Sequence, residues 1–232
     1  MSSRIRKFVL PRGIRIAVQS LLALVITIVV AAAAVLFMTQ LFVVKTIQVE
    51  GTEILPREEI VRVSDIKLGT RLAQLDTHAA AVRVAQIPRV KKVRVSVAYP
   101  SRAIIKVDER VGVAFFRAGG IFFEIAADEV VMKSRVRPRE LPEIVVPNPG
   151  KASLQREAAV KVAQRLPADI KEKVRVIRVD SAAMVVLELR DGRRVEMGSA
   201  TRLGDKVVTL RIVLSQEGSV WNIANPALPT RR

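Results

Sequence analysis

The longest apolar run in the chain extends from Ile16 to Val44 without a charged residue, and its densest part, Leu21–Met38, has Thr27 as its only polar side chain. About 20 apolar residues span a bilayer, so the run predicts one transmembrane helix. Buried core helices rarely continue this long without charge. The Ala31–Ala34 segment is similar to a signal-peptide cleavage site, but the apolar run continues past it, and signal-peptide cores have only about 7–15 apolar residues.

Three stretches between residues 43 and 110 alternate apolar and polar side chains. A period of two is typical of a strand with one buried face. Gly51 ends the first stretch, and Tyr99-Pro100-Ser101 predicts a hairpin loop between the second and the third. The apolar positions are Ile47 and Val49 in the first stretch, Val93, Val95 and Val97 in the second, and Ile105 and Val107 in the third.

Two short helices are predicted between the first and second of these strands. Pro56, followed by Glu58 and Glu59, favours a helix start. Asp76 or Thr77 can cap the second helix. Two helices on a sheet of three strands close a small core, so this region predicts a domain with the order strand, helix, helix, strand, strand. The face of the second helix expected to be buried consists of Ala81, Val82 and Ala85.

Residues 111-232 combine further strands with a helix. Ala118-Gly119-Gly120 predicts a hairpin turn, as does Asp191-Gly192. The Pro-containing segment 141-150 indicates a loop, and an apolar stripe predicts a helix over Leu154–Leu166. The strands expected around the two turns are Val113–Arg117, Ile121–Ile125, Val174–Val179, Met184–Leu189 and a last one containing Val195 and Met197.

A helix and two short strands are predicted at the end of the sequence. The helix is predicted from about Thr201 or Arg202 to Leu214, with Leu203, Val207, Leu210 and Leu214 on one face. Asn225-Pro226 separates the predicted strands Ser219–Ile223 and Ala227–Thr230. An edge strand has free N–H and C=O groups, which favour addition of a partner strand. Pro229 has no N–H, so its nitrogen is expected to point away from the neighbouring strand.

The net charge of +17 is distributed along the whole chain. Five basic residues and no acid precede the apolar run, which places the N-terminus in the cytoplasm and the following domains outside it. The remaining +12 is interleaved with Asp and Glu, and no aromatic RNA-binding motif or recognition-helix motif is present. The sequence therefore favours a basic surface facing anionic lipid or wall polymer over nucleic-acid binding.

Residues suited to catalysis or metal binding are scarce. The chain has no cysteine and one histidine, His78, which excludes thiol catalysis and Cys/His metal sites. No nucleophile-elbow motif accompanies His78, so a surface histidine is the expected interpretation. Asp108-Glu109 and Asp128-Glu129 are expected to be solvated charges, not paired catalytic carboxylates. No enzymatic activity, cofactor, metal or small-molecule substrate is predicted.

The order of elements and the run VKTIQVEG…LPREEIV…LGTRLAQLD…IPRVKKVRVSVAYPSRAIIKVDER resembles a POTRA domain. Directly after one transmembrane helix, this run resembles the FtsQ/DivIB family of bacterial cell-division proteins, as do LPEIV, LELRDGRRVEMG and the helix with Lys206. The segment NPALPT is similar to actinobacterial members. Val207 stands where the family helix usually has Leu, and Asp128-Glu129-Val130 replaces the usual Asp-x-x-Gly turn.

The resemblance implies an α+β fold divided into a cytoplasmic basic tail (1-15), a transmembrane helix (16-42), a POTRA domain (43-110) and a β domain (111-232). The β domain is expected to be a mixed α/β unit with a largely antiparallel sheet that ends in an edge strand. The resemblance further implies a single-pass protein of the bacterial cell membrane, enriched at the division septum. A polypeptide-transport POTRA receptor and a wall-polymer-modifying enzyme remain alternatives.

The partners implied by the resemblance are FtsB/DivIC-type and FtsL-type division proteins, captured by the β-domain edge, with other divisome members possible at the POTRA domain. Trp221 has two interpretations, an interface anchor or a core residue. Arg202 and Lys206 either pair with acidic partner side chains or lie on a solvated helix face. The candidate partner-binding residues are Arg202, Lys206, Val220, Trp221, Asn222, Ile223, Ala227, Leu228, Pro229 and Thr230.

Overall fold

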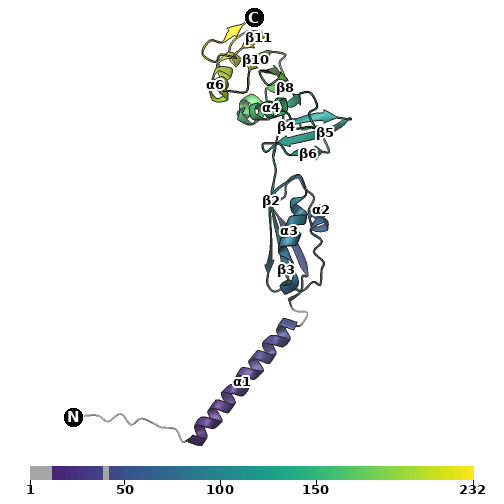
Figure 1. Ribbon diagram of the computed structural model, residues 1–232, viewed down its shortest axis with the longest axis vertical. Helices are drawn as coiled ribbons and strands as arrows, with labels where there is room; N and C mark the ends of the chain where they lie inside the picture. The colour runs from purple at the N-terminus through teal and green to yellow at the C-terminus, as the bar shows by residue number, and fades with distance from the viewer. Residues whose placement is uncertain (1–11, 39–41) are drawn as a thin grey trace, which may run out of the picture. The chain divides into compact units, whose positions relative to one another are not determined.

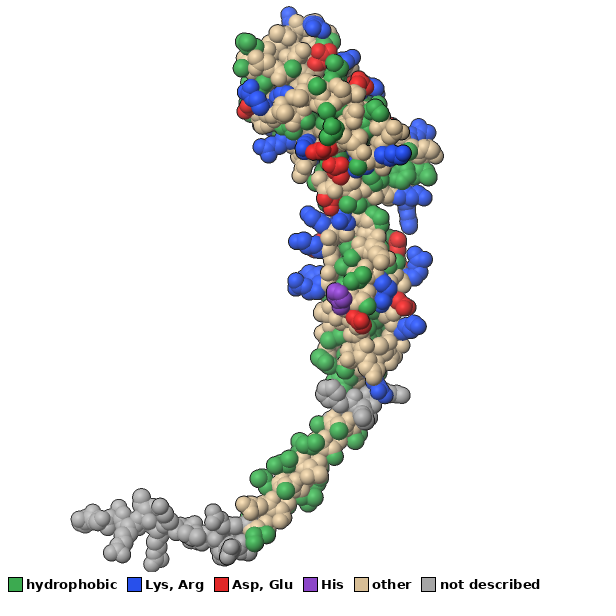
Figure 2. Space-filling model, in the orientation of Figure 1, with side chains coloured by type: hydrophobic (Ala, Val, Ile, Leu, Met, Phe, Trp, Pro, Cys, Tyr) green, Lys and Arg blue, Asp and Glu red, His purple; other side chains and the backbone are tan. Residues whose placement is uncertain are grey.

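The computed structural model describes residues 12–38 and 42–232 (Figure 1). Helix α1 (Arg12–Met38) contains the window Ile16–Val35, with a mean hydropathy of 2.5, which within the described ranges is the one helix long and apolar enough to cross a membrane. Side chains 16–35 are all exposed, and Figure 2 shows apolar side chains along α1. The predicted tail (1-15) and span (16-42) extend over residues 1–11 and 39–41, which lie outside the described residues.

The chain divides into two compact units. The first comprises residues up to 52 together with 56–84 and 93–107, and the second comprises 53–55, 85–92 and 108–232. A three-stranded sheet belongs mainly to the first unit, and a nine-stranded sheet belongs to the second. The predicted α+β class is confirmed, because one apolar N-terminal helix precedes a three-stranded sheet with its helices and then a sheet-rich region.

The three-stranded sheet has the order β1-β3-β2, with β1 parallel to β3. Val95 and Ile105 are buried in the core, together with Ile60 and Val84 from two helices. The predicted order strand, helix, helix, strand, strand is confirmed, with one 3-10 turn added between the helices. The elements are β1 (Thr46–Glu50), α2 (Arg57–Ser64), η2 (Leu72–Gln74), α3 (Thr77–Ala85), β2 (Val90–Ala98) and β3 (Arg102–Glu109).

Helix α3 begins as predicted but buries a different face. The Asp76 carboxylate accepts a hydrogen bond from Ala79 N at 2.8 Å and so caps the helix. Ala80 and Val84 are buried, so the predicted face of Ala81, Val82 and Ala85 is wrong. The nine-residue helix has two possible apolar faces, one with Ala81 and Ala85 and one with Ala80 and Val84. The second face is the buried one, and the small side chain of Ala80 allows close packing.

Gly51 ends β1 because the chain passes very close to β3 at this point. Its φ of +81° lies in the left-handed region, and a Cβ built on it would lie 2.1 Å from the Val107 carbonyl oxygen. Both the conformation and the space favour glycine. The V-x-G end of the first strand is therefore a requirement of packing between β1 and β3.

The nine-stranded sheet has the order β12-β11-β10-β9-β8-β7-β4-β5-β6, and most neighbouring pairs are antiparallel. Its core includes side chains from the strands and from α4 and α6. The elements are β4 (Gly112–Ala118), β5 (Ile121–Ala126), β6 (Val131–Ser134), β7 (Glu143–Val145), α4 (Leu154–Arg165), α5 (Ala168–Lys171), β8 (Val174–Ser181), β9 (Met184–Leu189), β10 (Arg194–Gly198), α6 (Leu203–Leu214), β11 (Val220–Asn222) and β12 (Thr230–Arg231).

Both predicted hairpins of this sheet are present, β4 with β5 and β9 with β10. The prediction that 141-150 is entirely a loop is wrong, because β7 (Glu143–Val145) lies there between β4 and β8 and is parallel to both. A strand of three residues is too short to show alternation, and the Pro residues around it favour a loop interpretation.

Three carboxylates of the second unit are bonded within the protein, one to backbone N–H groups and two to arginine side chains. Glu109 accepts hydrogen bonds from the backbone N–H groups of residues 53–55 at 2.9–3.3 Å. Asp128 pairs with Arg110 at 2.8 Å, and this hydrogen bond lowers the pKa of the Asp128 carboxyl below its ordinary value. Glu129 pairs with Arg156 at 3.2 Å. Asp128 is exposed as expected, whereas Glu109 and Glu129 are half-buried and so differ from the expected solvated charges.

Candidate partner-binding edge

Strand β12 forms one edge of the nine-stranded sheet. It pairs antiparallel with β11, with Trp221 opposite Arg231 and Asn222 opposite Thr230, and Arg232 N donates to Val220 O at 2.9 Å. Because alternate residues of a strand point the same way, the N–H and C=O of Arg231 point away from β11. Pro229, two residues before Arg231, also directs its backbone away from β11, but it has no N–H to donate. The outer side of β12 therefore offers one donor, at Arg231, and the carbonyls of Pro229 and Arg231.

The segment before β12 is a turn, so the predicted strand Ala227–Thr230 is wrong in its position. The Asn225 side-chain oxygen accepts from Ala227 N at 3.2 Å, and Leu228 N donates to Asn225 O at 3.1 Å. Asn side chains favour such turns by bonding to backbone two residues on. The strand begins only at Thr230, after Pro229. Ala227, Leu228, Pro229 and Thr230 are all exposed.

Strand β11 supports the edge from within the sheet. Its neighbour on the inner side is β10, to which it is parallel, with Val195 opposite Trp221. Trp221 is 7% exposed and belongs to the core, which favours the core interpretation of this residue. A Cβ added to Gly218 would lie 2.8 Å from Trp221 Nε1, so the indole packs closely against this glycine. Ile223 is buried, and Val220 and Asn222 are half-buried.

Lys206 and Arg202 differ from each other in the structure. Lys206 is 2% exposed, and its ammonium donates to the carbonyl oxygens of Met197 at 2.7 Å and Ser199 at 2.8 Å. Burial, with a smaller contribution from the Arg202 charge, lowers the pKa of Lys206 below its ordinary value. The expectation of a solvated Lys206 is therefore wrong. Arg202 is exposed and pairs with Asp205 at 3.0 Å.

Exposed apolar side chains near this edge were not predicted from the sequence. Val208 and Ile212 lie on the outer face of α6, one helical turn apart, and both are exposed. The Thr209 hydroxyl of the same helix donates to Pro226 O at 2.9 Å, so α6 adjoins the turn that carries exposed Leu228. Val208 and Ile212 are apolar but lie outside the predicted buried stripe of α6. Apolar residues outside that stripe are the signal from which an exposed apolar surface could have been predicted.

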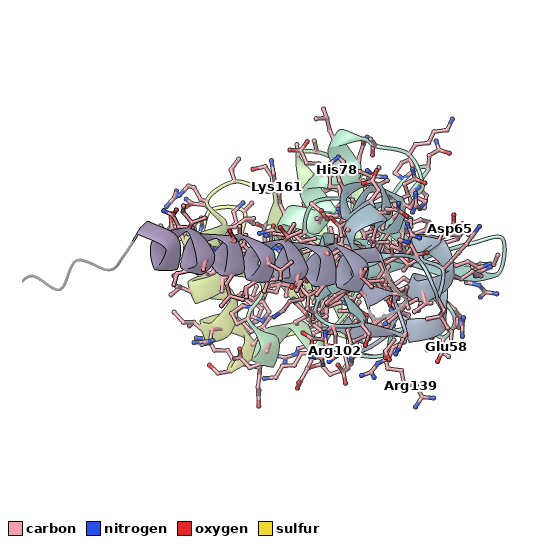
Figure 3. All side chains as sticks on the ribbon, turned by 90° about the horizontal axis from the view of Figure 1, so that it is seen from below. Glu58, Asp65, His78, Arg102, Arg139 and Lys161 are labelled. Carbon is pink, nitrogen blue, oxygen red and sulfur yellow. The ribbon has the colours of Figure 1, made fainter. Side chains whose placement is uncertain are left out.

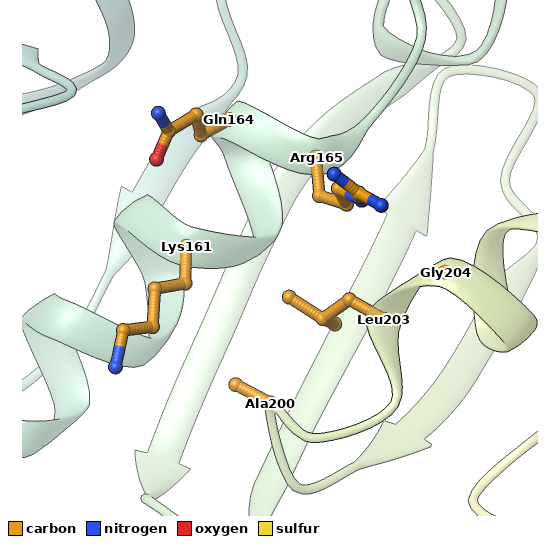
Figure 4. A pocket seen from close by; sticks show the side chains of 6 residues that line it. All are labelled: Lys161, Gln164, Arg165, Ala200, Leu203 and Gly204. Carbon is orange, nitrogen blue, oxygen red and sulfur yellow. The ribbon is translucent and has the colours of Figure 1, made fainter.

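The described residues show no arrangement suited to catalysis. His78 is exposed on α3, and Figure 3 shows its side chain pointing outward. Among the residues described, no three His, Cys, Asp or Glu side chains gather as a metal site would require. The open pocket in Figure 4 lies between α4 and the start of α6 and has no carboxylate or imidazole; its lining residues are Lys161, Gln164, Arg165, Ala200, Leu203 and Gly204.

Two family models match adjoining parts of the chain. The FtsQ-type POTRA domain model matches residues 42–110, and the C-terminal model of the cell division protein FtsQ/DivIB matches residues 109–225. The second match alone covers half of the chain. It includes β11 and ends before β12.

Curated relatives extend the likeness over nearly the whole chain. The cell division protein FtsQ of Mycolicibacterium smegmatis is 34% identical over 94% of this chain and 65% of its own length, and that of Mycobacteroides abscessus is 33% identical over 90% and 68%. The chain thus spans about two thirds of these relatives. Among solved structures, the major extracytoplasmic domain of DivIB from Geobacillus stearothermophilus matches with a TM-score of 0.38 at 16% identity, over 47% of this chain and 93% of that one.

Proposed function

The chain belongs to the FtsQ/DivIB family of cell division proteins, and we propose that it serves in the divisome as a non-enzymatic scaffold. In this proposal it binds FtsB/DivIC-type and FtsL-type membrane proteins and thereby links early and late division proteins at the septum. The observation that carries the proposal is β12, which is a two-residue strand at the sheet edge with an outward-facing backbone at Arg231. A partner strand added there would extend the sheet by backbone hydrogen bonds.

The surroundings of β12 fit an amphipathic partner that is acidic. Arg231 and Arg232 are exposed, so acidic side chains on an added strand would be attracted. Val208 and Ile212 of α6, with Leu228 of the turn, offer apolar contacts beyond the strand itself. Small coiled-coil membrane proteins can provide both an extended segment and an apolar helix face. In this proposal Lys206 does not contact the partner. It supports the edge indirectly, because its hydrogen bonds position the segment after β10.

The experiment compares three variants of the full chain in membranes that also contain the FtsB/DivIC-type and FtsL-type proteins of the same bacterium. Deletion of residues 227–232 should abolish co-purification of both partners. Arg231→Pro should weaken it strongly, because it removes the one outward donor of β12 while the inward bond of Arg232 remains. Arg231→Ala removes the side chain but keeps the N–H, so it should weaken binding less.

Circular dichroism and melting temperature establish whether each variant is folded. A folded deletion variant that still binds both partners would place the partner site elsewhere, with the POTRA domain as the next surface to test. Equal effects of Arg231→Pro and Arg231→Ala would assign binding to the side chain and contradict strand addition.

A further inference from the structure

Three segments of the first unit meet at the end where β1 begins. Val44 N donates to Thr70 O and Gly69 N donates to Val44 O, each at 2.8 Å, which places the loop Lys67–Arg71 beside the start of β1. Lys45 N donates to Ser101 O at 2.8 Å, and the rings of Phe42 and Tyr99 pack edge to face at 5.8 Å. The β2–β3 hairpin loop therefore lies there too. Residues 42–45, 67–71 and 99–102 together are termed the basal end.

The basal end exposes large apolar side chains. Leu68, at the tip of its loop, is 66% exposed, and Tyr99, at the tip of the hairpin, is 60% exposed. Figure 2 shows apolar side chains at the end of this domain next to the start of β1. Tyrosine is enriched where proteins contact the membrane interface, because its ring is apolar and its hydroxyl remains in water. Leu68 and Tyr99 therefore present a small apolar surface at loop tips.

The three segments of the basal end also carry four cations. Lys45, Lys67, Arg71 and Arg102 are all exposed. None of the four lies within 4.0 Å of a carboxylate in the described part of the chain, whereas many other arginines there are paired. Exposed Asp65 is the acid nearest in sequence to the loop. The basal end thus carries an excess of unpaired positive charge, which attracts anions over about 8–10 Å at physiological ionic strength.

The chain connection keeps the basal end near a bilayer that contains α1. Helix α1 ends at Met38, and Phe42 follows four residues later. An extended chain spans at most about 3.6 Å per residue, so Phe42 stays within roughly 15 Å of the end of α1. The headgroup region extends about 5–8 Å beyond each side of the hydrocarbon core. Lipid headgroups are therefore within reach of the basal end.

We propose that the basal end binds the bilayer surface, with Leu68 and Tyr99 at headgroup level and the four cations on anionic phospholipid headgroups. Apolar tips rimmed by Lys and Arg are the composition that interfacial membrane binding requires. An anionic wall polymer would be attracted by the cations but would give Leu68 no apolar environment. The surface lies in the first unit, so this proposal does not depend on partner capture at β12.

A single-cysteine experiment tests the proposal, and the cysteine-free chain needs no background removal. Ser101→Cys places a polarity-sensitive fluorophore on the basal end, and Ser96→Cys places it on β2, roughly 10 Å before the hairpin tip, as the matched control. The full chain is reconstituted in vesicles of phosphatidylcholine, alone or with phosphatidylglycerol, that carry nitroxide-labelled lipids. The expected result is quenching at position 101 but not at 96, and stronger quenching with phosphatidylglycerol. No quenching at 101, or equal quenching at both positions, would overturn the proposal.

Charge and apolar variants separate direct binding from mere proximity. Lys67→Glu with Arg71→Glu should remove the extra quenching at 101 in anionic vesicles, while Lys92→Glu with Arg94→Glu, an equal charge change on exposed positions of β2, should not. Leu68→Ser should reduce quenching in both vesicle types. Equal losses from the two charge variants would contradict a specific basal surface. A fluorescence change with purified anionic wall polymer, in the absence of lipid quenching, would assign the surface to that polymer.

Discussion

At the scale of single residues, Lys206 connects α6 to the end of β10. An ammonium group in the interior is costly unless it is hydrogen-bonded, and Lys206 donates to two carbonyl oxygens, those of Met197 and Ser199. The bonds therefore fix the segment between β10 and α6. Strand β10 is in turn the neighbour of β11 in the sheet.

Lys206→Met should lower the free energy of unfolding of the second unit by about 1–3 kcal/mol, because it leaves two carbonyls without their donor. The matched control is Lys161→Met, since Lys161 is exposed on α4 and pairs only with Glu157 one turn away; it should change stability by less than about 0.5 kcal/mol. Denaturant unfolding followed by the fluorescence of Trp221, the single tryptophan, measures both. Equal effects would contradict a structural role for Lys206.

Periodicity could not have identified this role. The apolar stripe predicted for α6 comprises Leu203, Val207, Leu210 and Leu214. Leu210 is buried as predicted, but the other three are only half-buried, and Thr209 and Val213 are buried instead. Compared with the predicted face, α6 is rotated about its axis so that Lys206 points toward the end of β10, where its ammonium donates to two carbonyl oxygens. Such a rotation depends on tertiary hydrogen bonds, which a single-chain pattern does not contain.

At the scale of elements, alternation located the longer strands correctly. In β2 and β3 the inward positions are Val95, Ile105 and Val107, as the period of two predicts. Short elements were less predictable: β7 has three residues and β12 has two, too few for a pattern. At β12 the local turn formed by Asn225 moved the strand start to Thr230, so the turn determined the register.

Val95→Asp tests the packing of the three-stranded sheet. Val95 lies between the sheet and its helices, and an unpaired carboxylate there should cost several kcal/mol, on the order of 3 or more. Ser96→Asp places the same charge on the exposed neighbouring position and should cost little. Thermal melting by circular dichroism compares the two. An unchanged melting temperature for Val95→Asp would contradict the assigned inward face of β2.

At the scale of the whole molecule, charge and hydropathy divide the chain into parts with different surroundings. Residues 16–35 of helix α1 expose apolar side chains, whereas the parts of the chain that form the two sheets expose Lys, Arg, Asp and Glu (Figure 2). The membrane segment and the strand–helix order were predictable, because long apolar runs and alternation are local properties of a sequence. The sheet order was not, because β7 inserts between β4 and β8 through non-local pairing.

The asymmetry of basic residues around α1 predicts the topology of the molecule. Five basic residues and no acid precede the apolar run, and positively charged flanks remain in the cytoplasm. We therefore expect the three-stranded and the nine-stranded sheet to lie outside the cytoplasm. A reporter that is active only in the cytoplasm should be silent when fused after Arg232 and active when fused before Met1. Replacing the five basic residues by Glu should increase the activity of the C-terminal fusion, because the orienting charge is lost. Activity of that fusion in the unaltered chain would show that the predicted orientation is wrong, and the β12 edge would then face cytoplasmic partners.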